Sequence, residues 1–466
     1  MYKNAVRIVY STLISIMVFM TVAPSAYAAA QVTEYNVPSP NSGTSGITYG
    51  SDGNIWFTER QTNKIGKMTP TGVFTEYVIP TINADPLSIT AGPDGNLWFT
   101  ENGANKIGKI TPTGTITEYP IPSANAFAVN ITAGPDGNLW FTEGNNDKIG
   151  KITPTGTITE YPIPVTLYSA SPGGIASGAD GKIWFTQVNA NKIGSVTTSG
   201  VFAEYDIPTA SSFPWDIAAG GDGNYWFLEG SGSTNGKVAR ITPAGVITEF
   251  PLLHPASFPW RIATGPGGSL WFSESSALGL IMQINPNGTI TEYNVPSTNA
   301  GAYDLVEDGN HNMWFAESAT DKIAKISGFS YPTAPAVINH SSIVSTGSSI
   351  VVDVLTGVSG NPNASTLQIV SGPSHGTAVD PPNTITYTPN KGYTGPDSLT
   401  YRVCSTDNPL LCTQAVLSFS VVAGIPNTGF GGHTNNLSTG DNIYIIGIFS
   451  LIAIGFGLRR TRRPLK

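Results

Sequence analysis

The sequence contains little cysteine and little histidine, and these shortages exclude some kinds of site. Only 2 cysteines and 5 histidines occur in 466 residues. Cys404 and Cys412 have no histidine near them, so the chain lacks the ligand spacing of a structural zinc site. In an oxidising compartment we expect these two cysteines to close a small loop as a disulfide.

Charge is also scarce, because charged residues make up only 12% of the chain and the formal net charge is −8. A weakly charged, acidic chain is a poor partner for nucleic acid, so we expect no nucleic-acid binding. Glycine and proline are abundant instead, with 52 and 35 residues along the chain. Frequent turns of this kind favour an all-β protein.

The first 28 residues have the order of a secretory signal peptide. Lys3 and Arg7 precede a largely apolar stretch at 8–20, and Ala26-Tyr27-Ala28 is a small-x-small cleavage site. We therefore expect residues 1–28 to be removed on export. A retained membrane anchor is the alternative.

The C-terminal end resembles the sorting signal of Gram-positive surface proteins. A pentapeptide and a polar spacer occupy 423–442, followed by an apolar run at 443–458 and a basic tail at 459–466. In that family a sortase cuts after the threonine of the motif, here Thr428, and joins it to the cell wall. The apolar run is expected to span the membrane before sorting, and a plain single-pass anchor is the alternative. The motif consists of Ile425, Pro426, Asn427, Thr428 and Gly429, with isoleucine where the family usually has leucine.

Between the two ends, one pattern returns seven times. Its clearest copy reads GPDGNLWFTE from Gly92 to Glu101, and the tryptophans of successive copies are 42, 42, 44, 42, 45 and 43 residues apart. A fixed period of this size indicates one supersecondary unit stacked many times. The seven tryptophans are Trp56, Trp98, Trp140, Trp184, Trp226, Trp271 and Trp314.

Each copy is expected to form four short antiparallel strands, which is one blade of a β-propeller. Residues 31–327 are therefore predicted to form a seven-bladed β-propeller. The fourth-strand motif Glu-Tyr first occurs at Glu34-Tyr35, before the first tryptophan, and is missing after Trp314. We therefore expect residues 32–37 to close the ring as the outer strand of the seventh blade. In the copy at 88–122, the strands are expected at 88–91, 97–101, 107–110 and 115–121.

A linker at 328–335 follows the repeats, and residues 336–422 show a different pattern. Short alternating runs such as 349–354 and 415–422 are typical of strands. They resemble the Ig-like, cadherin-like modules of bacterial surface proteins, and several strands in fewer than 100 residues favour a β-sandwich. We interpret this module as a spacer.

Two loops that join successive blades differ from the other copies. They read Ser212-Phe213-Pro214-Trp215 and Ser257-Phe258-Pro259-Trp260, and Tyr303 holds the matching place in the last blade. Such loops open on one face of a propeller, so these rings are expected at the mouth of the channel, where they would suit a sugar or another flat amphipathic ligand. Alternatively, they plug the channel and pack on one another. His254 lies on an interblade loop of the same face, as a member of this ligand site or as a surface residue.

Acidic residues recur in nearly every copy, and repetition favours a structural role. The second strands end on glutamates, which we expect to pair with the repeated lysines across the next loop. The aspartates beside glycine are expected to serve turn geometry rather than calcium binding. The glutamates are Glu59, Glu101, Glu143, Glu229, Glu274 and Glu317, with Gln187 in the remaining copy; the lysines are Lys64, Lys106, Lys148, Lys192 and Lys322; the aspartates are Asp52, Asp94, Asp136, Asp180 and Asp222.

The repeat GPDGNLWFTE…NKIGKITPTGTITEYPIP closely resembles the virginiamycin B lyase family, the streptogramin lyases, over residues 31–327. The resemblance implies a seven-bladed propeller and, in active members, a magnesium-assisted elimination that opens the cyclic ester of streptogramin B antibiotics. Those members use histidines at the starts of the last two innermost strands, where this chain has Trp260 and Tyr303. Glu317 is the nearest candidate for their catalytic glutamate. An indole has no basic lone pair and a phenol is protonated near pH 7, so we expect the elimination to be absent or very weak.

The sequence therefore predicts an exported protein of the cell surface that binds an extracellular ligand, a glycan or a small amphipathic molecule, without a cofactor. The alternative is an enzyme, either of the streptogramin lyase type with magnesium or another extracellular propeller lyase. The further partners implied are sortase, the cell wall and, before sorting, the membrane.

Overall fold

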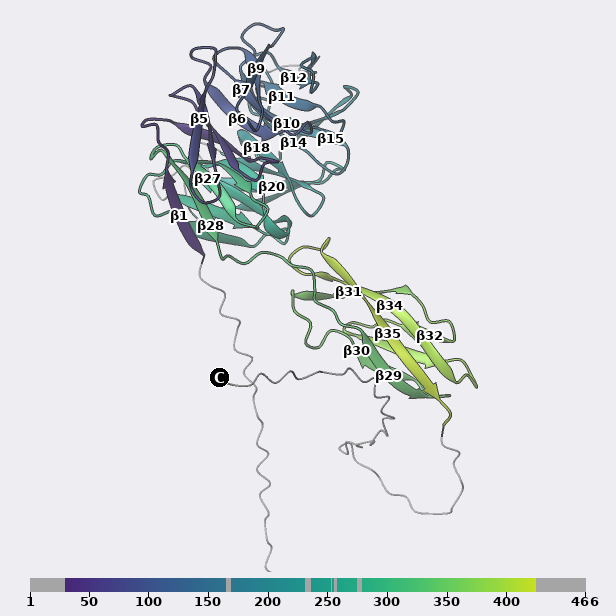
Figure 1. Ribbon diagram of the computed structural model, residues 1–466. Coiled ribbons are helices and arrows are strands. Elements are labelled where there is room, and N and C mark those ends of the chain that lie inside the picture. Colours follow the sequence, from purple (N-terminus) through teal and green to yellow (C-terminus); the bar gives the residue numbers. More distant parts are fainter. Residues whose placement is uncertain are drawn as a thin grey trace, which may run out of the picture. The chain divides into compact units, whose positions relative to one another are not determined.

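The computed structural model describes residues 30–164, 169–230, 236–252, 254, 258–274 and 279–424 (Figure 1). The signal peptide expected at 1–28, the sorting motif at 425–429 and the apolar run at 443–458 lie outside the described residues. Among the residues that are described, no helix has the length and apolar character needed to cross a membrane.

The all-β prediction is confirmed, and the repeats form seven sheets of four strands each. The sheets are β2 (Thr44–Tyr49), β3 (Ile55–Glu59), β4 (Lys64–Met68) and β5 (Phe74–Val78); β6 (Pro86–Ala91), β7 (Leu97–Glu101), β8 (Lys106–Ile110) and β9 (Ile116–Pro120); β10 (Ala128–Ala133), β11 (Leu139–Glu143), β12 (Lys148–Ile152) and β13 (Ile158–Pro162); β14 (Pro172–Ser177), β15 (Lys182–Gln187), β16 (Lys192–Thr197) and β17 (Phe202–Asp206). They continue with β18 (Pro214–Ala219), β19 (Tyr225–Glu229), β20 (Lys237–Ile241) and β21 (Ile247–Pro251); β22 (Pro259–Thr264), β23 (Leu270–Glu274), β24 (Leu280–Ile284) and β25 (Ile290–Asn294), with the 3-10 turn η1 (Pro266–Gly268); and β26 (Ala302–Glu307), β27 (Met313–Glu317) and β28 (Lys322–Ser327) with β1 (Gln31–Asn36).

The last of these sheets joins the two ends of the repeat region. β1 pairs antiparallel with β28, and Glu34 lies opposite Ala324. The Nζ of Lys322 contacts the Glu34 carboxylate at 2.6 Å. This pairing is the one expected from the position of the first Glu-Tyr motif. The first strands of the seven sheets contact one another in succession, and β2 also contacts β26.

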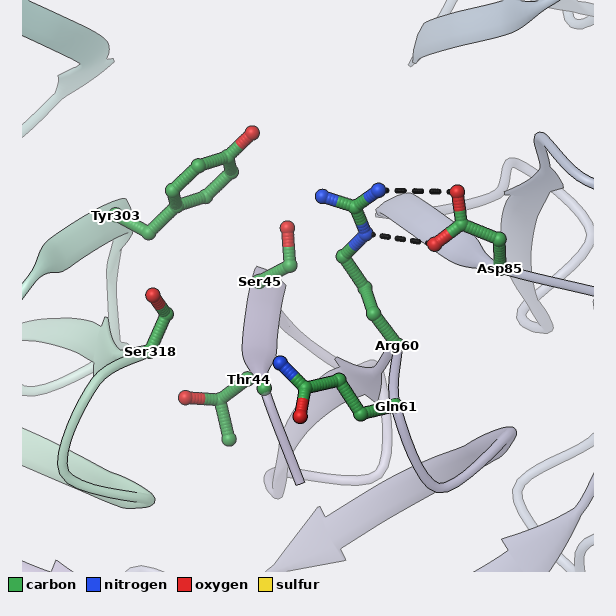
Figure 2. A pocket seen from close by; sticks show the side chains of 8 residues that line it. Thr44, Ser45, Arg60, Gln61, Asp85, Tyr303 and Ser318 are labelled. Carbon is green, nitrogen blue, oxygen red and sulfur yellow. Dashed lines mark hydrogen bonds and ion pairs between the residues drawn. The ribbon is translucent and has the colours of Figure 1, made fainter. Parts of the chain in front are cut away.

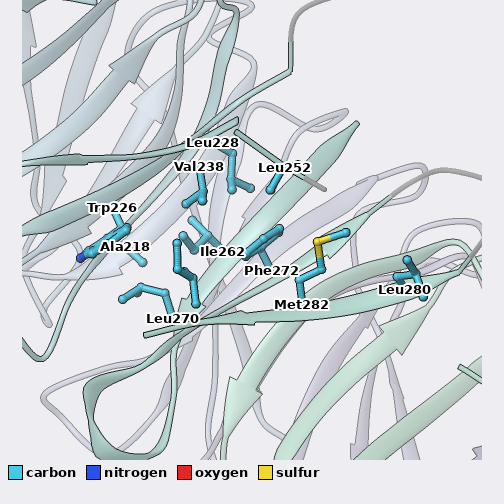
Figure 3. Close-up of a cluster of buried hydrophobic side chains, with 11 residues drawn as sticks. Ala218, Trp226, Leu228, Val238, Leu252, Ile262, Leu270, Phe272, Leu280 and Met282 are labelled. Carbon is cyan, nitrogen blue, oxygen red and sulfur yellow. The ribbon is translucent and has the colours of Figure 1, made fainter. Parts of the chain in front are cut away.

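Neighbouring sheets pack through side chains of their second strands, which are buried on both faces. Trp226 and Phe272 are 0% exposed and belong to one such cluster between two sheets (Figure 3). Within a sheet, each repeat tryptophan stacks on the aromatic ring of a fourth strand, as Trp98 does on Tyr119 at 5.6 Å. The burial of these large apolar faces explains why the copies must be stacked to be stable.

The turn aspartates have a second role that the sequence did not reveal. Oδ1 of Asp94 accepts a hydrogen bond from the backbone N–H of Asn96 at 3.2 Å, as the turn prediction requires. The same atom also accepts the indole N–H of the buried Trp98 at 3.1 Å. Each such aspartate therefore satisfies a donor that would otherwise be buried without a partner.

The predicted pairing of second-strand glutamates with lysines is wrong. Lys106 instead contacts the fourth-strand Glu118 at 3.2 Å and Thr81 at 2.6 Å. Glu101 is 0% exposed, and neither of its carboxyl oxygens has a hydrogen-bond partner among the described residues. The long lysine side chain reaches the more exposed of the two carboxylates, where its ammonium group keeps contact with water.

Residues 340–422 form two further sheets of their own. The strands include the expected segments at 349–354 and 415–422, and the core contains Tyr387, Tyr401 and Leu417. Cys404 and Cys412 form the expected disulfide, with their Cα atoms 3.9 Å apart. The first sheet has the order β29 (His340–Ser345), β35 (Cys412–Val422), β34 (Gly395–Ser405) and β31 (Pro362–Ser371); the second has β30 (Ile350–Asp353), β33 (Thr384–Pro389) and β32 (Gly376–Val379).

Candidate ligand-binding site

A β-bulge occurs near the start of the first strand in each of the seven sheets of the described repeats. In β6, for example, the register shifts between Pro86 and Ile89, and the backbone N–H of Ser88 donates to Oγ1 of Thr100 at 3.0 Å. A bulge re-aims the side chains beside it. The residue two places before the buried aliphatic one therefore faces a cavity in every sheet. These residues are Ser45, Leu87, Val129, Gly173, Trp215, Trp260 and Tyr303.

Three of the predicted ligand-site residues form a continuous aromatic surface, here called the mouth: Trp215, Trp260 and Tyr303. The ring centres of Trp215 and Trp260 are 5.1 Å apart, and those of Trp260 and Tyr303 are 5.9 Å apart. Phe258 packs against both tryptophans, at 6.3 and 5.8 Å. The rings thus contact one another, as the plug interpretation requires, but they also border open space.

That space is a cavity of about 350 Å³. Its apolar wall includes the mouth together with Phe127 and Val129, and its polar groups include Arg60 and Arg261. A mostly apolar concave surface with a few polar groups is the usual form of a small-molecule site. The rings of the mouth therefore border open space rather than only filling the channel.

A polar cluster lies below the mouth, one residue further along the first strands. Arg261 is 7% exposed, and its Nη1 lies 3.8 Å from Oδ1 of Asp216. Asp216 also accepts the backbone N–H of Ile262 at 3.1 Å and Nδ2 of Asn130 at 3.2 Å. Gly174 leaves the room that the Asp216 carboxylate occupies, because a Cβ there would collide with it. These contacts compensate the buried guanidinium.

The cluster perturbs the acids and the phenol around it. Burial raises the pKa of Asp304 to about 6, since the attraction of Arg261 offsets burial only in part and Asp216 opposes ionisation further. Burial alone would also raise the pKa of Tyr303. Arg261, the indole of Trp260 and Arg60 outweigh burial, so the pKa of the Tyr303 hydroxyl is lowered.

The remaining predicted residues lie away from the mouth or face elsewhere. Phe213 is 40% exposed and does not line the cavity. Nε2 of His254 lies 3.1 Å from the carboxylate of Glu292. The sheet that contains Glu292 has Leu280 at the position of the repeated lysine. His254 thus replaces a structural partner of that glutamate. Glu317 is 0% exposed, accepts a hydrogen bond from Oγ1 of Thr320 at 2.6 Å and has its pKa raised by burial.

The donor set of the mouth does not fit magnesium. This ion prefers carboxylate and water oxygens, whereas two guanidinium groups border the cavity. The carboxylate of Asp85, which does not line this cavity, is held by Nε and Nη2 of Arg60 at 2.8 and 2.9 Å. Within the described part of the chain, no group of three or more histidine, cysteine, aspartate or glutamate residues is placed to hold a metal ion.

Arg60, Arg261, Asp216 and Asp304 were not predicted from the sequence, although a signal for most of them exists. Apart from Arg60, they occupy the position just before the buried aliphatic residue of the first strand. The seven copies disagree at that position, as they do at the mouth position before it. The full set is Gly46, Ser88, Asn130, Gly174, Asp216, Arg261 and Asp304.

Seven four-stranded sheets around a cavity at the starts of their first strands define the β-propeller class, and the comparisons give the family. The chain belongs to the virginiamycin B lyase family, because the sequence model of that family matches residues 24–234 and 165–333. Residues 332–420 match the model of a bacterial Ig domain. A solved streptogramin B lyase is 38% identical, with a TM-score of 0.60 over 64% of this chain and 97% of that chain.

Two further relatives are virginiamycin B lyases. A catalytically inactive histidine-to-alanine variant from Staphylococcus aureus, solved with quinupristin, is 38% identical over 64% of this chain and 99% of that chain, with a TM-score of 0.60. The curated enzyme from Bacillus licheniformis is 52% identical over 42 residues, which cover only 9% of this chain and 14% of that protein.

Proposed function

We propose that the chain is a cell-surface binding protein of the virginiamycin B lyase family, with a ligand site at the aromatic mouth of a closed seven-bladed propeller. The observation that carries the proposal is the contact series Trp215, Trp260 and Tyr303 along a cavity of about 350 Å³. Flat aromatic faces bind the apolar side of a sugar ring or another small amphipathic molecule.

The second candidate function is the family's elimination reaction, favoured by 38% identity along nearly the whole of a streptogramin B lyase. The chemistry of the mouth speaks against it. Trp260 and Tyr303 stand where the resemblance places histidines, and two arginines border the cavity where a magnesium ion would require carboxylates. We therefore give binding precedence over elimination.

Export and anchoring are part of the same proposal. The signal peptide at 1–28, the sorting motif around Thr428 and the apolar run at 443–458 would tether the propeller outside the cell through sortase and the cell wall. The Ig-like module would serve as a spacer. Replacement of Thr428 by alanine should abolish covalent attachment to the wall, and continued attachment would exclude the sortase pathway.

Two measurements test the binding proposal. On a glycan array, the wild-type chain should give signals that a Trp215→Ala/Trp260→Ala variant lacks, because the variant loses both ring faces. Equal signals from the two proteins would contradict a ligand site at the mouth. Incubation with a streptogramin B and magnesium should leave the antibiotic ring closed, and rapid ring opening would establish the enzyme alternative instead.

A further inference from the structure

A second cavity adjoins the cavity at the mouth, and Arg60 and Tyr303 line both. It has a volume of about 280 Å³ and is polar, with hydroxyl, amide and guanidinium groups on its walls. Figure 2 shows the side chains that converge on it from three sheets. The lining consists of Gly43, Thr44, Ser45, Arg60, Gln61, Asp85, Tyr303 and Ser318.

Two hydroxyl groups in this cavity have hydrogen-bonding capacity that the protein does not use. Thr44 is 0% exposed and Ser45 is 2% exposed, and neither Oγ atom has a hydrogen-bond partner among the described residues. Most buried polar groups are paired, so two adjacent unpaired hydroxyls require an explanation. The Ser45 hydroxyl points into the space between Tyr303 and Arg60 (Figure 2).

Arg60 supplies a directed positive charge on the same wall. Its Nε and Nη2 atoms bind the Asp85 carboxylate in a two-point contact, which fixes the plane of the guanidinium group. Nη1 makes no hydrogen bond within the part of the chain that the structure describes, and in Figure 2 it lies on the side of Tyr303. The cavity therefore combines one oriented cationic donor with the hydroxyls of Thr44, Ser45 and Tyr303.

This combination selects an anionic oxygen ligand. Arginine can only donate hydrogen bonds, and a hydroxyl can donate as well, whereas an ionised carboxylate accepts up to four. We propose that the pocket formed by Thr44, Ser45, Arg60 and Tyr303 binds the carboxylate of an acidic sugar whose ring lies against the mouth. The inference rests on the proposed function, because the mouth must bind the ring for its carboxylate to reach the pocket.

The test compares two ligands that differ only in the proposed contact. The purified chain is titrated calorimetrically with a glucuronic acid-containing tetrasaccharide and with its carboxyl-reduced, neutral counterpart. The acidic sugar should bind about tenfold more tightly, as one charge-assisted contact and two hydroxyl contacts would give. Thr44→Val/Ser45→Ala should reduce that preference, leaving the part that Arg60 contributes, without lowering the melting temperature, because no protein hydrogen bond is lost.

A matched control variant removes a buried, unpartnered hydroxyl outside the pocket. Thr346 also has a buried hydroxyl without a partner, in the Ig-like module, so Thr346→Val should retain the preference for the acidic sugar. If both sugars bind equally, or Thr44→Val/Ser45→Ala binds the acidic sugar as wild type does, the carboxylate pocket is wrong. A loss of binding in Trp215→Ala/Trp260→Ala would then still support the mouth. If neither sugar binds wild type, sugar binding at the mouth fails together with the pocket.

Discussion

Nη2 of Arg261 lies 3.4 Å from the phenol oxygen of Tyr303, and the guanidinium carbon lies 5.1 Å from the centre of the same ring. A buried cation in this position stabilises the ionised phenol, which is the reason for the lowered pKa of Tyr303. The mouth thus contains a tyrosine whose proton is more easily lost than that of an ordinary tyrosine.

The first prediction concerns this titration. The phenolate absorbance of Tyr303 is the part of the signal that Tyr303→Phe removes. Its titration midpoint should lie at a lower pH in wild type than in Arg261→Gln, since Arg261→Gln loses the cation beside the hydroxyl. The measurement is a difference spectrum between each protein and its Tyr303→Phe derivative. Identical midpoints in the two backgrounds would show that Arg261 does not govern the phenol.

The second prediction concerns the buried glutamates of the second strands. Burial and the neighbouring Glu118 raise the pKa of Glu101 to about 8. In the sheet where Gln187 replaces this residue, its amide nitrogen donates to Glu204 at 2.9 Å. We infer that Glu101 is mostly protonated at neutral pH and that Gln187 is its permanently neutral equivalent in the other sheet.

At pH values between the unfolded pKa of Glu101, near 4.5, and its folded pKa, near 8, the Glu101 carboxylate must take up a proton when the chain folds. The contribution of this group to stability falls as pH rises through that window and is constant above it. One pKa unit corresponds to about 1.4 kcal/mol, so Glu101→Gln should gain roughly 4 kcal/mol over wild type at pH 8 and less than about 1 kcal/mol at pH 5. Glu118→Gln, which breaks the contact with Lys106, should destabilise at both pH values. A pH-independent effect of Glu101→Gln, measured by denaturant unfolding, would contradict the inference.

The third prediction concerns the polar cluster below the mouth. Asp216→Leu leaves the Arg261 guanidinium without its carboxylate in a buried site and should cost about 3 kcal/mol. Arg261→Met should cost a similar amount for the converse reason. The double variant replaces the pair with apolar side chains and should recover much of the loss, which a double-mutant cycle of unfolding free energies measures. Simple additivity of the two losses would show that the residues do not form a pair.

The fold was predictable because its determinants are local and repeated. Gly92 to Glu101 encodes a turn and a buried strand without reference to the rest of the chain, and seven copies confirm each other. Even there, β6 begins at Pro86 rather than at 88, because the bulge adds residues that turn signals do not mark. Strand pairing followed from the repeat, whereas the exact strand ends did not.

The site was predictable only in part, because it depends on which residues differ between copies. Trp215, Trp260 and Tyr303 stood out as large aromatic exceptions. Thr44 and Ser45 did not, since small hydroxyl residues are common throughout the repeats and only burial reveals that they have no partner. The lysine pairing was wrong for a related reason. Glu101, Lys106 and Glu118 share one face of a sheet, and the sequence does not tell which carboxylate the lysine reaches.

The last prediction tests whether β1 is as firmly held as the outer strand of the β26–β28 sheet as β9 is as the outer strand of the β6–β8 sheet. Tyr35 stacks on Trp314 at 5.8 Å, and Tyr119 stacks on Trp98 at 5.6 Å. If the propeller is closed by its N-terminal strand, the two tyrosines have equivalent surroundings although Tyr35 lies near the start of the described chain. Tyr35→Ala and Tyr119→Ala should then each cost about 2 kcal/mol of unfolding free energy. In an open array the first strand would fray, so a cost for Tyr35→Ala well below that for Tyr119→Ala would contradict closure, and chemical denaturation of the two variants distinguishes these outcomes.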